Sequence, residues 1–153
     1  NAPDIMVAIR KAIEENDELR KQAEDYLREK VEIVKDQLVK NMVDHSGIKL
    51  IRFSAVIMPE IVKDVAFRIR TQVTERLLFV AGTTDPSSGK PLLTVMLSDD
   101  MVAAGLNASK IVREAAKQIQ GGGGGQPHFA QAGGKNADGL VAAIDKIIEL
   151  AEI

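Results

Sequence analysis

The first 46 residues constrain the fold most, because they contain no glycine and only one proline, Pro3, at a position where a helix can begin. From Ile5 the apolar side chains recur mostly every three or four residues, which is the spacing of one face of an α-helix. A helix of about 40 residues would be roughly 60 Å long. A small domain needs no helix of that length. The apolar stripe of this helix must therefore pack against a further surface.

Two partners are open for this helix. It could lie as an arm on its own globular part, or pair as a coiled coil with a second copy or a neighbouring domain. Asn16 falls within the stripe and could set the register of such a pair, at a cost in stability. We expect the arm over residues 1–46, with Gly47 as the helix C-cap, and a homodimer formed through it. The predicted oligomerisation residues are Ile5, Ile9, Leu19, Leu27, Val34 and Leu38.

In residues 47–153 the spacing of the apolar residues changes from that of a helix, and the new pattern predicts a small α/β (α+β) domain with a mixed sheet. Apolar stretches predict strands over 48–57, 77–81 and 92–97, the last two forming an antiparallel hairpin around a turn at 83–89. Helices are expected over 60–76, 108–120 and 140–151, with a short one after Ser98 closed by Gly105. Asn107 and Asn136 are predicted N-caps. Residues 121–134 are expected to form a glycine-rich loop, in which the irregular stretch after Gly125 could hold a short edge strand.

The amino-acid composition excludes several classes of functional site. The absence of cysteine excludes disulfides, thiolate zinc sites and cysteine nucleophiles, and only two histidines, His45 and His128, are present. No serine–histidine–aspartate pattern or metal-spaced carboxylate cluster is found, so we expect no catalytic residue, metal or cofactor in this chain. The formal net charge of −2 provides no global field for nucleic acid. Without an apolar run of about 20 residues or a secretory pattern, we expect a cytoplasmic protein with no membrane partner.

A run of five glycines is the most conspicuous candidate site. Glycine leaves the main-chain amides uncovered, so a phosphate or ribose can approach them closely. The predicted capped helices on both sides favour a structured surface over a flexible linker. No Gly-Lys-Ser/Thr follows and no strand precedes the run, which excludes a P-loop and a dinucleotide fingerprint. The run and its continuation comprise Gly121, Gly122, Gly123, Gly124, Gly125, Gln126, Pro127 and His128.

Three cations precede the glycines on one face of the predicted helix: Lys110, Arg113 and Lys117. At these spacings they could contact two or three phosphates, or they could form an ordinary solvated face. A second basic group, Arg68, Arg70 and Arg76, is equally ambiguous.

The glycines, Pro127, the sequence Ala130-Gln131-Ala132-Gly133-Gly134 and the capped helix that follows resemble the C-terminal domain of bacterial alanyl-tRNA synthetases. The resemblance covers the whole chain, because that family also places a long helical arm before its globular domain. The globular part is similar to the DHH-associated domain shared with single-strand nucleases and oligonucleotide phosphoesterases.

This resemblance implies a module that binds the outer corner of the alanine tRNA and dimerises through the arm. It would support aminoacylation and editing without carrying either active site, and ATP, magnesium and zinc would belong to preceding domains absent from this chain. The RNA-facing candidates carried over are Gly121–Gly125, Gln126, Pro127 and His128. Many bacterial relatives have arginine in place of Gln126 and an acidic residue in place of His128. We therefore expect the backbone amides, Lys110, Arg113 and Lys117 to make the contacts.

Two alternatives stay open. The chain could be the substrate-binding domain of a DHH-type phosphoesterase, which metal motifs elsewhere in the protein would support. It could also be a purely structural coiled-coil module. Residues 1–46 carry 8 Lys+Arg and 11 Asp+Glu, whereas residues 47–153 carry 12 and 11. A net charge of only +1 on the second block predicts weak RNA binding that gains from effective concentration within a larger protein.

Overall fold

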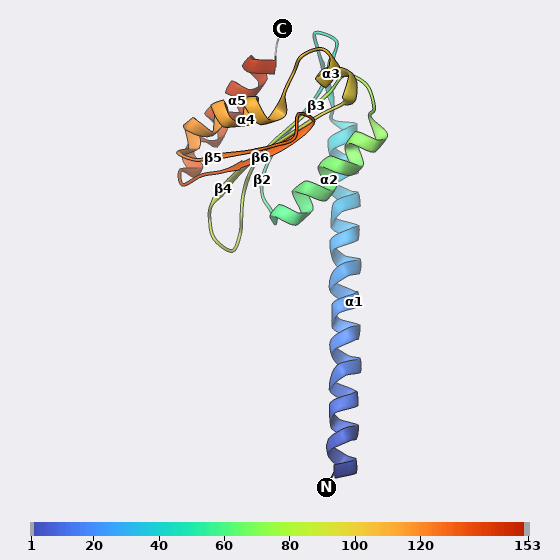
Figure 1. The fold of residues 1–153 in the computed structure, drawn as a ribbon. Coiled ribbons are helices and arrows are strands. Elements are labelled where there is room, and N and C mark those ends of the chain that lie inside the picture. The colour runs from blue at the N-terminus through green and yellow to red at the C-terminus, as the bar shows by residue number, and fades with distance from the viewer. Residues whose placement is uncertain (1, 152–153) are drawn as a thin grey trace.

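The computed structural model describes residues 2–151, in which one long helix leads into a domain built around a single sheet (Figure 1). The helices are α1 (Ala2–Lys40), α2 (Pro59–Gln72), α3 (Asp99–Ala103), α4 (Ala108–Ala115) and α5 (Leu140–Ala151), with 3-10 turns η1 (Ala116–Ile119) and η2 (Ala137–Gly139). The strands are β1 (Val43–His45), β2 (Ile48–Val56), β3 (Leu77–Thr84), β4 (Pro91–Leu97), β5 (Gly122–Gly125) and β6 (Phe129–Gly133).

The six strands lie in the order β1-β2-β3-β4-β6-β5. Strands β2 and β3 are parallel and are connected through α2, whereas every other neighbouring pair is antiparallel. The long helix and the mixed sheet with helices confirm the predicted α+β fold, and the β3–β4 pairing confirms the predicted hairpin.

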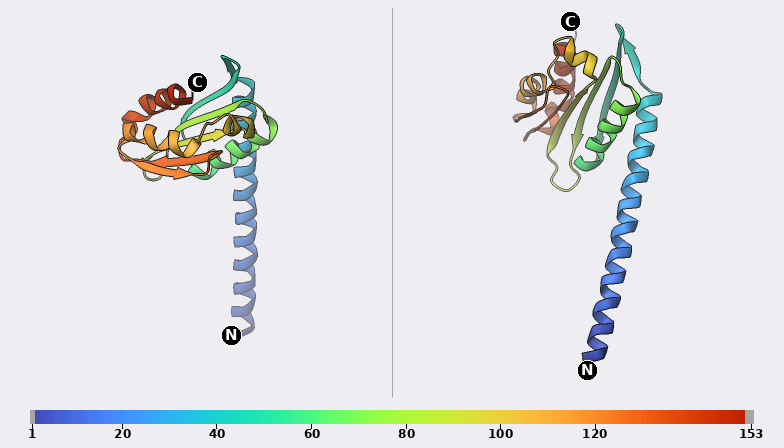
Figure 2. Two further views of the ribbon diagram at one scale, coloured as in Figure 1. Left: turned by 45° about the horizontal axis from the view of Figure 1, so that its top comes forward. Right: turned by 45° about the vertical axis from the view of Figure 1, so that its right-hand side comes forward.

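Helices cover both faces of the sheet, so alternate side chains of the central strands enter two separate cores (Figure 2). Leu77, Phe79 and Ala81 of β3 pack with α2 and the end of α1. Leu78 and Val80 point to the other side, where α4 and α5 pack. This explains why β3 is apolar without interruption, since a strand buried on both faces has no polar alternation.

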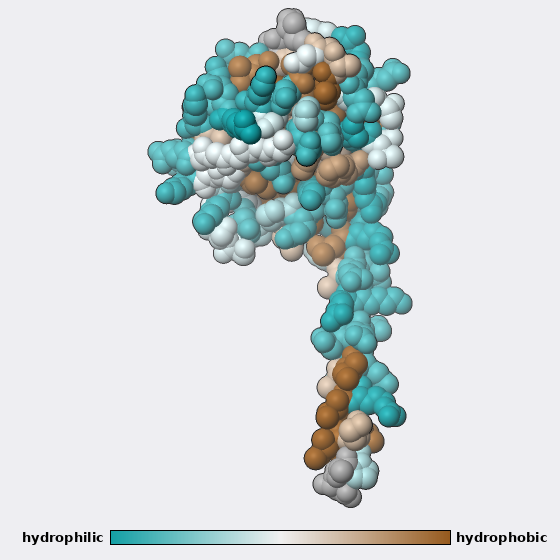
Figure 3. All heavy atoms as spheres, in the orientation of Figure 1, coloured by the Kyte–Doolittle hydropathy of each residue, from teal (hydrophilic) through white to brown (hydrophobic). Residues whose placement is uncertain are grey.

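The apolar stripe of α1 is buried at one end of the helix and exposed at the other. Its last third packs on the domain, where Val31 is 2% exposed and Val34 8%, while Leu27 and Leu38 are partly buried against the same core. The remainder stands away from the domain, and Figure 3 shows a hydrophobic stripe along it. The predicted oligomerisation residues Ile5, Ile9 and Leu19 are 50–64% exposed there.

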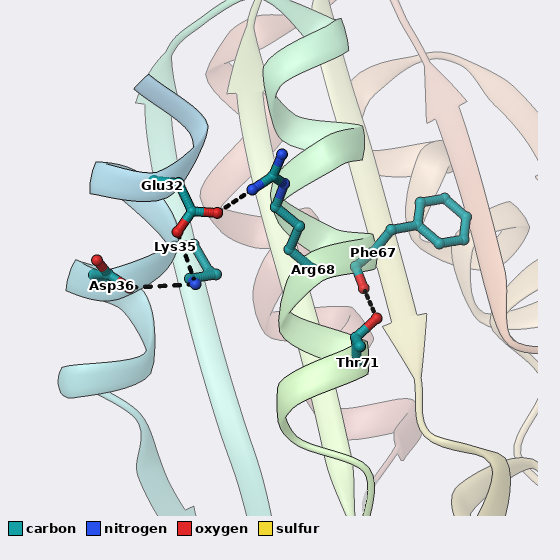
Figure 4. Close-up of polar contacts among 6 residues, drawn as sticks. All are labelled: Glu32, Lys35, Asp36, Phe67, Arg68 and Thr71. Carbon is teal, nitrogen blue, oxygen red and sulfur yellow. Dashed lines mark hydrogen bonds and ion pairs between the residues drawn. The ribbon is translucent and has the colours of Figure 1, made fainter. Parts of the chain in front are cut away.

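An ion pair joins α1 to α2 (Figure 4). Glu32 of α1 pairs with Arg68 of α2 and accepts a hydrogen bond of 3.0 Å from Lys35. The Lys35 ammonium lowers the pKa of the Glu32 carboxyl, and the Arg68 guanidinium contributes in the same direction. Phe67 points away from α1, and Thr71 Oγ1 donates to the Phe67 carbonyl within α2.

The start of the domain differs from the prediction, because α1 ends at Lys40 and Gly47 is not its C-cap. Residues Val43–His45 instead form β1, paired antiparallel with β2. Ser46 and Gly47 have φ values of 55° and 86°, the left-handed pair that a tight two-residue hairpin requires. Asp44 Oδ1 accepts from the Gly47 amide at 2.8 Å, so the polar sequence that suggested a helix end makes a hairpin turn.

Other boundaries shift for local reasons. Helix α2 ends at Gln72 rather than at Arg76, whose φ of 53° is incompatible with a continuing helix. The Asn107 side chain accepts from the Lys110 amide at 3.2 Å, which confirms that N-cap. Asn136 makes no side-chain cap bond; η2 precedes α5 instead, so that prediction is wrong. Strand β3 continues through Thr84, into the predicted turn, because its partner β4 already begins at Pro91.

Candidate nucleic-acid interface

The glycine run is a strand at the edge of the sheet. Gly122–Gly125 form β5, which pairs antiparallel with Phe129–Gly133 of β6. This confirms the prediction of a structured surface and corrects the expectation of a glycine-rich loop. Glycine has a poor strand propensity, so pairing with β6 and packing under α4 hold the strand in place.

Alternate positions of the run require glycine because β5 lies very close to β6. A Cβ at Gly121, Gly123 or Gly125 would lie 1.8, 2.2 or 2.6 Å from a β6 main-chain oxygen. Contacts that short do not occur in proteins, so any side chain there would push the two strands apart. A Cβ at Gly122, by contrast, would point into open space.

Arg113 connects α4 to the glycine strand. Its Nε donates to the Gly123 carbonyl oxygen at 3.3 Å. A Cβ at Gly124 would lie 3.1 Å from Arg113 Nη2 and 3.3 Å from the Ser109 Oγ. The helix can therefore approach the strand only because the strand carries no side chains. Sequence reasoning missed Ser109, since nothing in its spacing marks it as a neighbour of the glycines.

The three predicted cations are all exposed, Lys110 and Arg113 on α4 and Lys117 in the η1 turn that continues it. Of these, Arg113 contacts the strand directly, and Figure 1 shows α4 next to β5. Lys117 donates to Glu114 at 2.9 Å, and this hydrogen bond lowers the pKa of the Glu114 carboxyl. An exposed pair of this kind contributes little to stability, so the lysine can exchange its carboxylate for another anion. The structure thus brings the predicted cations and glycines onto one face.

The turn between β5 and β6 is held by main-chain hydrogen bonds. Gln126 and Phe129 exchange bonds of 2.8 and 3.3 Å across it. The Pro127 carbonyl accepts from the Ala108 amide and the His128 carbonyl from the Leu97 amide, both at 2.8 Å. Pro127 and His128 therefore join the start of α4 to the end of β4, while Gln126 is exposed at the edge.

Aromatic side chains are directed away from this face. Phe129 packs on Phe67 of α2 with ring centroids 4.8 Å apart. Phe53 and Phe79 also belong to the core on the α1–α2 side, whereas Ala130 and Ala132 of β6 face α4. Within residues 2–151 the face therefore offers cations and main chain rather than stacking platforms for bases.

The second basic group does not join this face. Arg68 pairs with Glu32, and Arg70 pairs with Asp99 while its Nε donates to the Leu97 carbonyl oxygen at 3.2 Å. Arg76 lines a pocket near the β1–β2 turn. No group of three or more His, Asp or Glu side chains suited to a metal ion occurs among the described residues. None of the described helices is both long and apolar enough to cross a membrane.

The comparisons with protein families and with known sequences agree on one family. The model of the DHHA1 domain matches residues 47–152. The alanine–tRNA ligase of Bacteroides thetaiotaomicron is 60% identical over all 153 residues, which are 17% of that protein's length. The chain thus spans about one sixth of the curated relatives it matches, and its resemblance to alanyl-tRNA synthetases is confirmed.

Two solved structures share the fold. The C-Ala domain of Aquifex aeolicus alanyl-tRNA synthetase superposes with a TM-score of 0.60 at 24% identity, covering 74% of this chain and 96% of that one. A DHH-domain protein from a family of ribosomal proteins gives a TM-score of 0.51 at 17% identity, covering 82% of this chain and 31% of that one. With the family model matching more than half of its residues, this chain belongs to the DHHA1 domain family.

Proposed function

We propose that this chain is a non-catalytic tRNA-binding module of an alanine–tRNA ligase, and that it binds RNA through the face formed by β5 and α4. The observation that carries the proposal is the placement of three exposed cations, Lys110, Arg113 and Lys117, beside a strand without side chains. The names of the relatives that match the full chain support the same role.

On this face the contacts are with the sugar–phosphate backbone. Lys110 and Lys117 extend freely enough to neutralise phosphates, and the bare main chain of β5 lets a nucleic-acid backbone approach it. Recognition would depend on RNA shape rather than on base edges, since helical RNA exposes mainly phosphates and 2′-hydroxyls. The proposed role includes support of aminoacylation and editing, with ATP, magnesium and zinc held by other parts of the ligase.

We also propose that the arm forms a homodimer. Ile5, Ile9 and Leu19 supply an exposed stripe on the half of α1 that lies outside the domain. Leu27, Val34 and Leu38 pack within the chain itself, so the proposed interface is restricted to the first half of the helix.

Removing the two lysines tests the RNA face. We expect the double variant Lys110→Ala, Lys117→Ala to bind folded tRNA about tenfold more weakly, with a salt dependence reduced by about one unit of slope per lysine. Fluorescence anisotropy at low and raised salt measures both quantities. Lys63→Ala, on exposed α2 at the other side of the sheet, is the matched control and should bind like the parent chain.

Two results would contradict the proposal. One is equal affinity for folded tRNA and for an unstructured RNA of the same length. The other is unchanged tRNA affinity of the double-lysine variant, which is what a purely structural module predicts.

A second candidate function is the substrate-binding domain of a DHH-type phosphoesterase, which the shared fold of the DHH-domain protein favours. The sequence of the rest of the protein separates the two. Aspartate-histidine-histidine metal motifs would support the phosphoesterase, whereas class II synthetase motifs would support the ligase.

A further inference from the structure

A pocket of about 620 Å³ lies away from the glycine strand, between the β1–β2 turn and α3, near the top of Figure 1. This volume is typical of pockets that hold small ligands. The β1–β2 hairpin, the residue before β3 and helix α3 supply its walls, including His45, Ser46, Ile48, Arg76, Asp100 and Met101.

Arg76 brings a positive charge to this pocket, and no ion pair within residues 2–151 neutralises it. The other arginines of the sheet and of α2 form ion pairs with carboxylates: Arg52 with Asp145 at 2.8 Å, Arg68 with Glu32 and Arg70 with Asp99. Among residues 2–151, Arg76 pairs with no carboxylate. Its Nη2 lies 3.2 Å from the position of a Cβ on Gly47, which places the guanidinium over the hairpin turn.

Asp100 fixes Arg76 through the main chain rather than through the guanidinium. Both carboxylate oxygens accept from the Arg76 amide, at 2.9 and 3.1 Å, and Oδ1 also accepts from the Ser98 hydroxyl. Arg76 is thereby held at a φ of 53°, a conformation that costs a non-glycine residue free energy. The main chain of Arg76 is therefore fixed at the rim of the pocket that its side chain lines.

Apolar side chains also line the pocket. Ile48 is half-buried at the start of β2, and Met101 of α3 is 6% exposed. A ligand that paired with Arg76 and also packed on Ile48 and Met101 would therefore combine an anion with an apolar, planar or compact group. A nucleoside phosphate has this composition, and the planar fork of an arginine matches phosphate oxygens in geometry.

We propose that this pocket binds a nucleoside phosphate, with the Arg76 guanidinium donating to the phosphate and Ile48 and Met101 packing against the base or ribose. Arg76 and Asp100 have opposite formal charges, so binding requires direct contact with the guanidinium rather than a long-range field. The phosphate could belong to a free mononucleotide or to the end of an RNA chain. This site is separate from the α4–β5 face, and the inference does not rest on that face binding tRNA.

Titration of the full chain with AMP, followed by amide chemical shifts in two-dimensional NMR, tests the proposal. We expect saturable shifts at Ser46, Gly47 and Met101, with sodium chloride at matched ionic strength as the blank. The variant Arg76→Asn keeps the amide that Asp100 binds and tolerates a left-handed φ. It should bind AMP about tenfold more weakly or worse. Arg52→Asn, which removes a guanidinium that is paired elsewhere, should bind within twofold of the parent chain.

Further titrations identify the source of the phosphate and show which results would overturn the proposal. Tighter binding of a 5′-phosphorylated RNA oligonucleotide than of AMP at the same amides assigns the site to an RNA end; the reverse order assigns it to a free nucleotide. Absence of saturable shifts with both probes overturns the proposal. So does equal affinity for adenosine and AMP, or equal affinity of Arg76→Asn and the parent chain. Lys110→Ala, Lys117→Ala should leave AMP binding unchanged, which separates this site from the RNA face.

Discussion

Gly123 and Arg113 show how two single residues build one surface. The Gly123 carbonyl accepts from Arg113 Nε, and its missing side chain lets β5 lie against β6. Arg113 therefore positions the strand as well as adding charge to it. Lys110 and Lys117 are exposed, and Lys117 is paired only with the exposed Glu114, so under the proposal their charges are the ones offered to a ligand.

The same added methyl group should destabilise the chain at Gly123 and leave its stability nearly unchanged at Gly122. Gly123→Ala places a Cβ 2.2 Å from the Gln131 carbonyl oxygen, and we expect it to lower the free energy of unfolding by about 1–3 kcal/mol. Gly122→Ala adds a methyl in open space and should change stability by about 0.5 kcal/mol or less. Urea denaturation measures both, and equal losses in the two variants would contradict the role of the β5–β6 approach.

Asp100 should make stability depend on pH in a narrow acid range. The Ser98 hydroxyl, followed by the Arg76 amide, lowers the pKa of the Asp100 carboxyl below its ordinary value of 3.8. A carboxyl whose pKa is lower in the folded chain contributes stability that is fully present above pH 3.8. That stability is lost as the pH falls through the folded value.

The parent chain and Asp100→Asn should therefore differ in unfolding free energy at pH 7 and by the same amount at pH 5. Their difference should shrink below pH 3.8, as the Asp100 carboxyl becomes protonated. Urea titrations at a series of pH values measure this difference. A difference that already declines between pH 7 and 5 would show that another group is responsible.

Helix α1 is one regular element with two environments. Its stripe continues on one face, but Val31 and Val34 are buried on α2 and the sheet while Ile5 and Ile9 are at least half exposed. Helix propensity alone supports an isolated helix poorly, so the exposed half has more to gain from a partner than the packed half. Strand β5 is the converse case, since tertiary pairing holds a segment with little strand propensity.

The two halves of α1 should respond differently to truncation of a side chain. Val31→Ala removes buried methyl groups from the core shared with α2, and we expect a loss of about 2 kcal/mol in the free energy of unfolding. Val7→Ala, at a position that is 66% exposed, should leave that free energy almost unchanged. Thermal and urea denaturation at low protein concentration compare the two. Similar losses would mean that the first half of α1 is also packed.

For the molecule as a whole, the domain and the free half of the arm offer separate surfaces. Figure 3 shows the hydrophobic stripe beyond the edge of the domain, whereas the proposed RNA face lies on the sheet edge farthest from β1. A dimer formed through the arm would leave both RNA faces accessible. Two weak faces in one assembly bind a larger partner more tightly than either alone, through effective concentration.

Two added lysines in the stripe should dissociate such a dimer. Ile5→Lys, Ile9→Lys places charges where the proposed partner packs, and we expect the mass measured by sedimentation equilibrium to fall from that of a dimer to that of a monomer. Glu14→Gln, Glu18→Gln changes the net charge by the same amount on the opposite face of α1 and should not alter the mass. A monomeric parent chain would rule out dimerisation through the arm.

Local signals in the sequence were sufficient for much of this structure. The stripe from Ile5, the apolar run of β3, the hairpin to β4 and the Asn107 cap each depend on neighbours within a few residues, so spacing and side-chain chemistry predicted them. The glycine run likewise marked a place where main chain is exposed, and Lys110, Arg113 and Lys117 marked one face of α4 and of the η1 turn that continues it.

Contacts between distant segments decided the rest. The turn at Ser46–Gly47 became a hairpin because β2 was present to pair with Val43–His45, and the glycines became an edge strand because β6 and Arg113 hold them. The stripe of α1 was divided between the domain and solvent by where α2 and the sheet end. The sequence determined which segments could be helix, strand or exposed main chain, since those are local preferences. Which partners satisfy those preferences depends on three-dimensional packing, because pairing and burial join residues far apart in the chain.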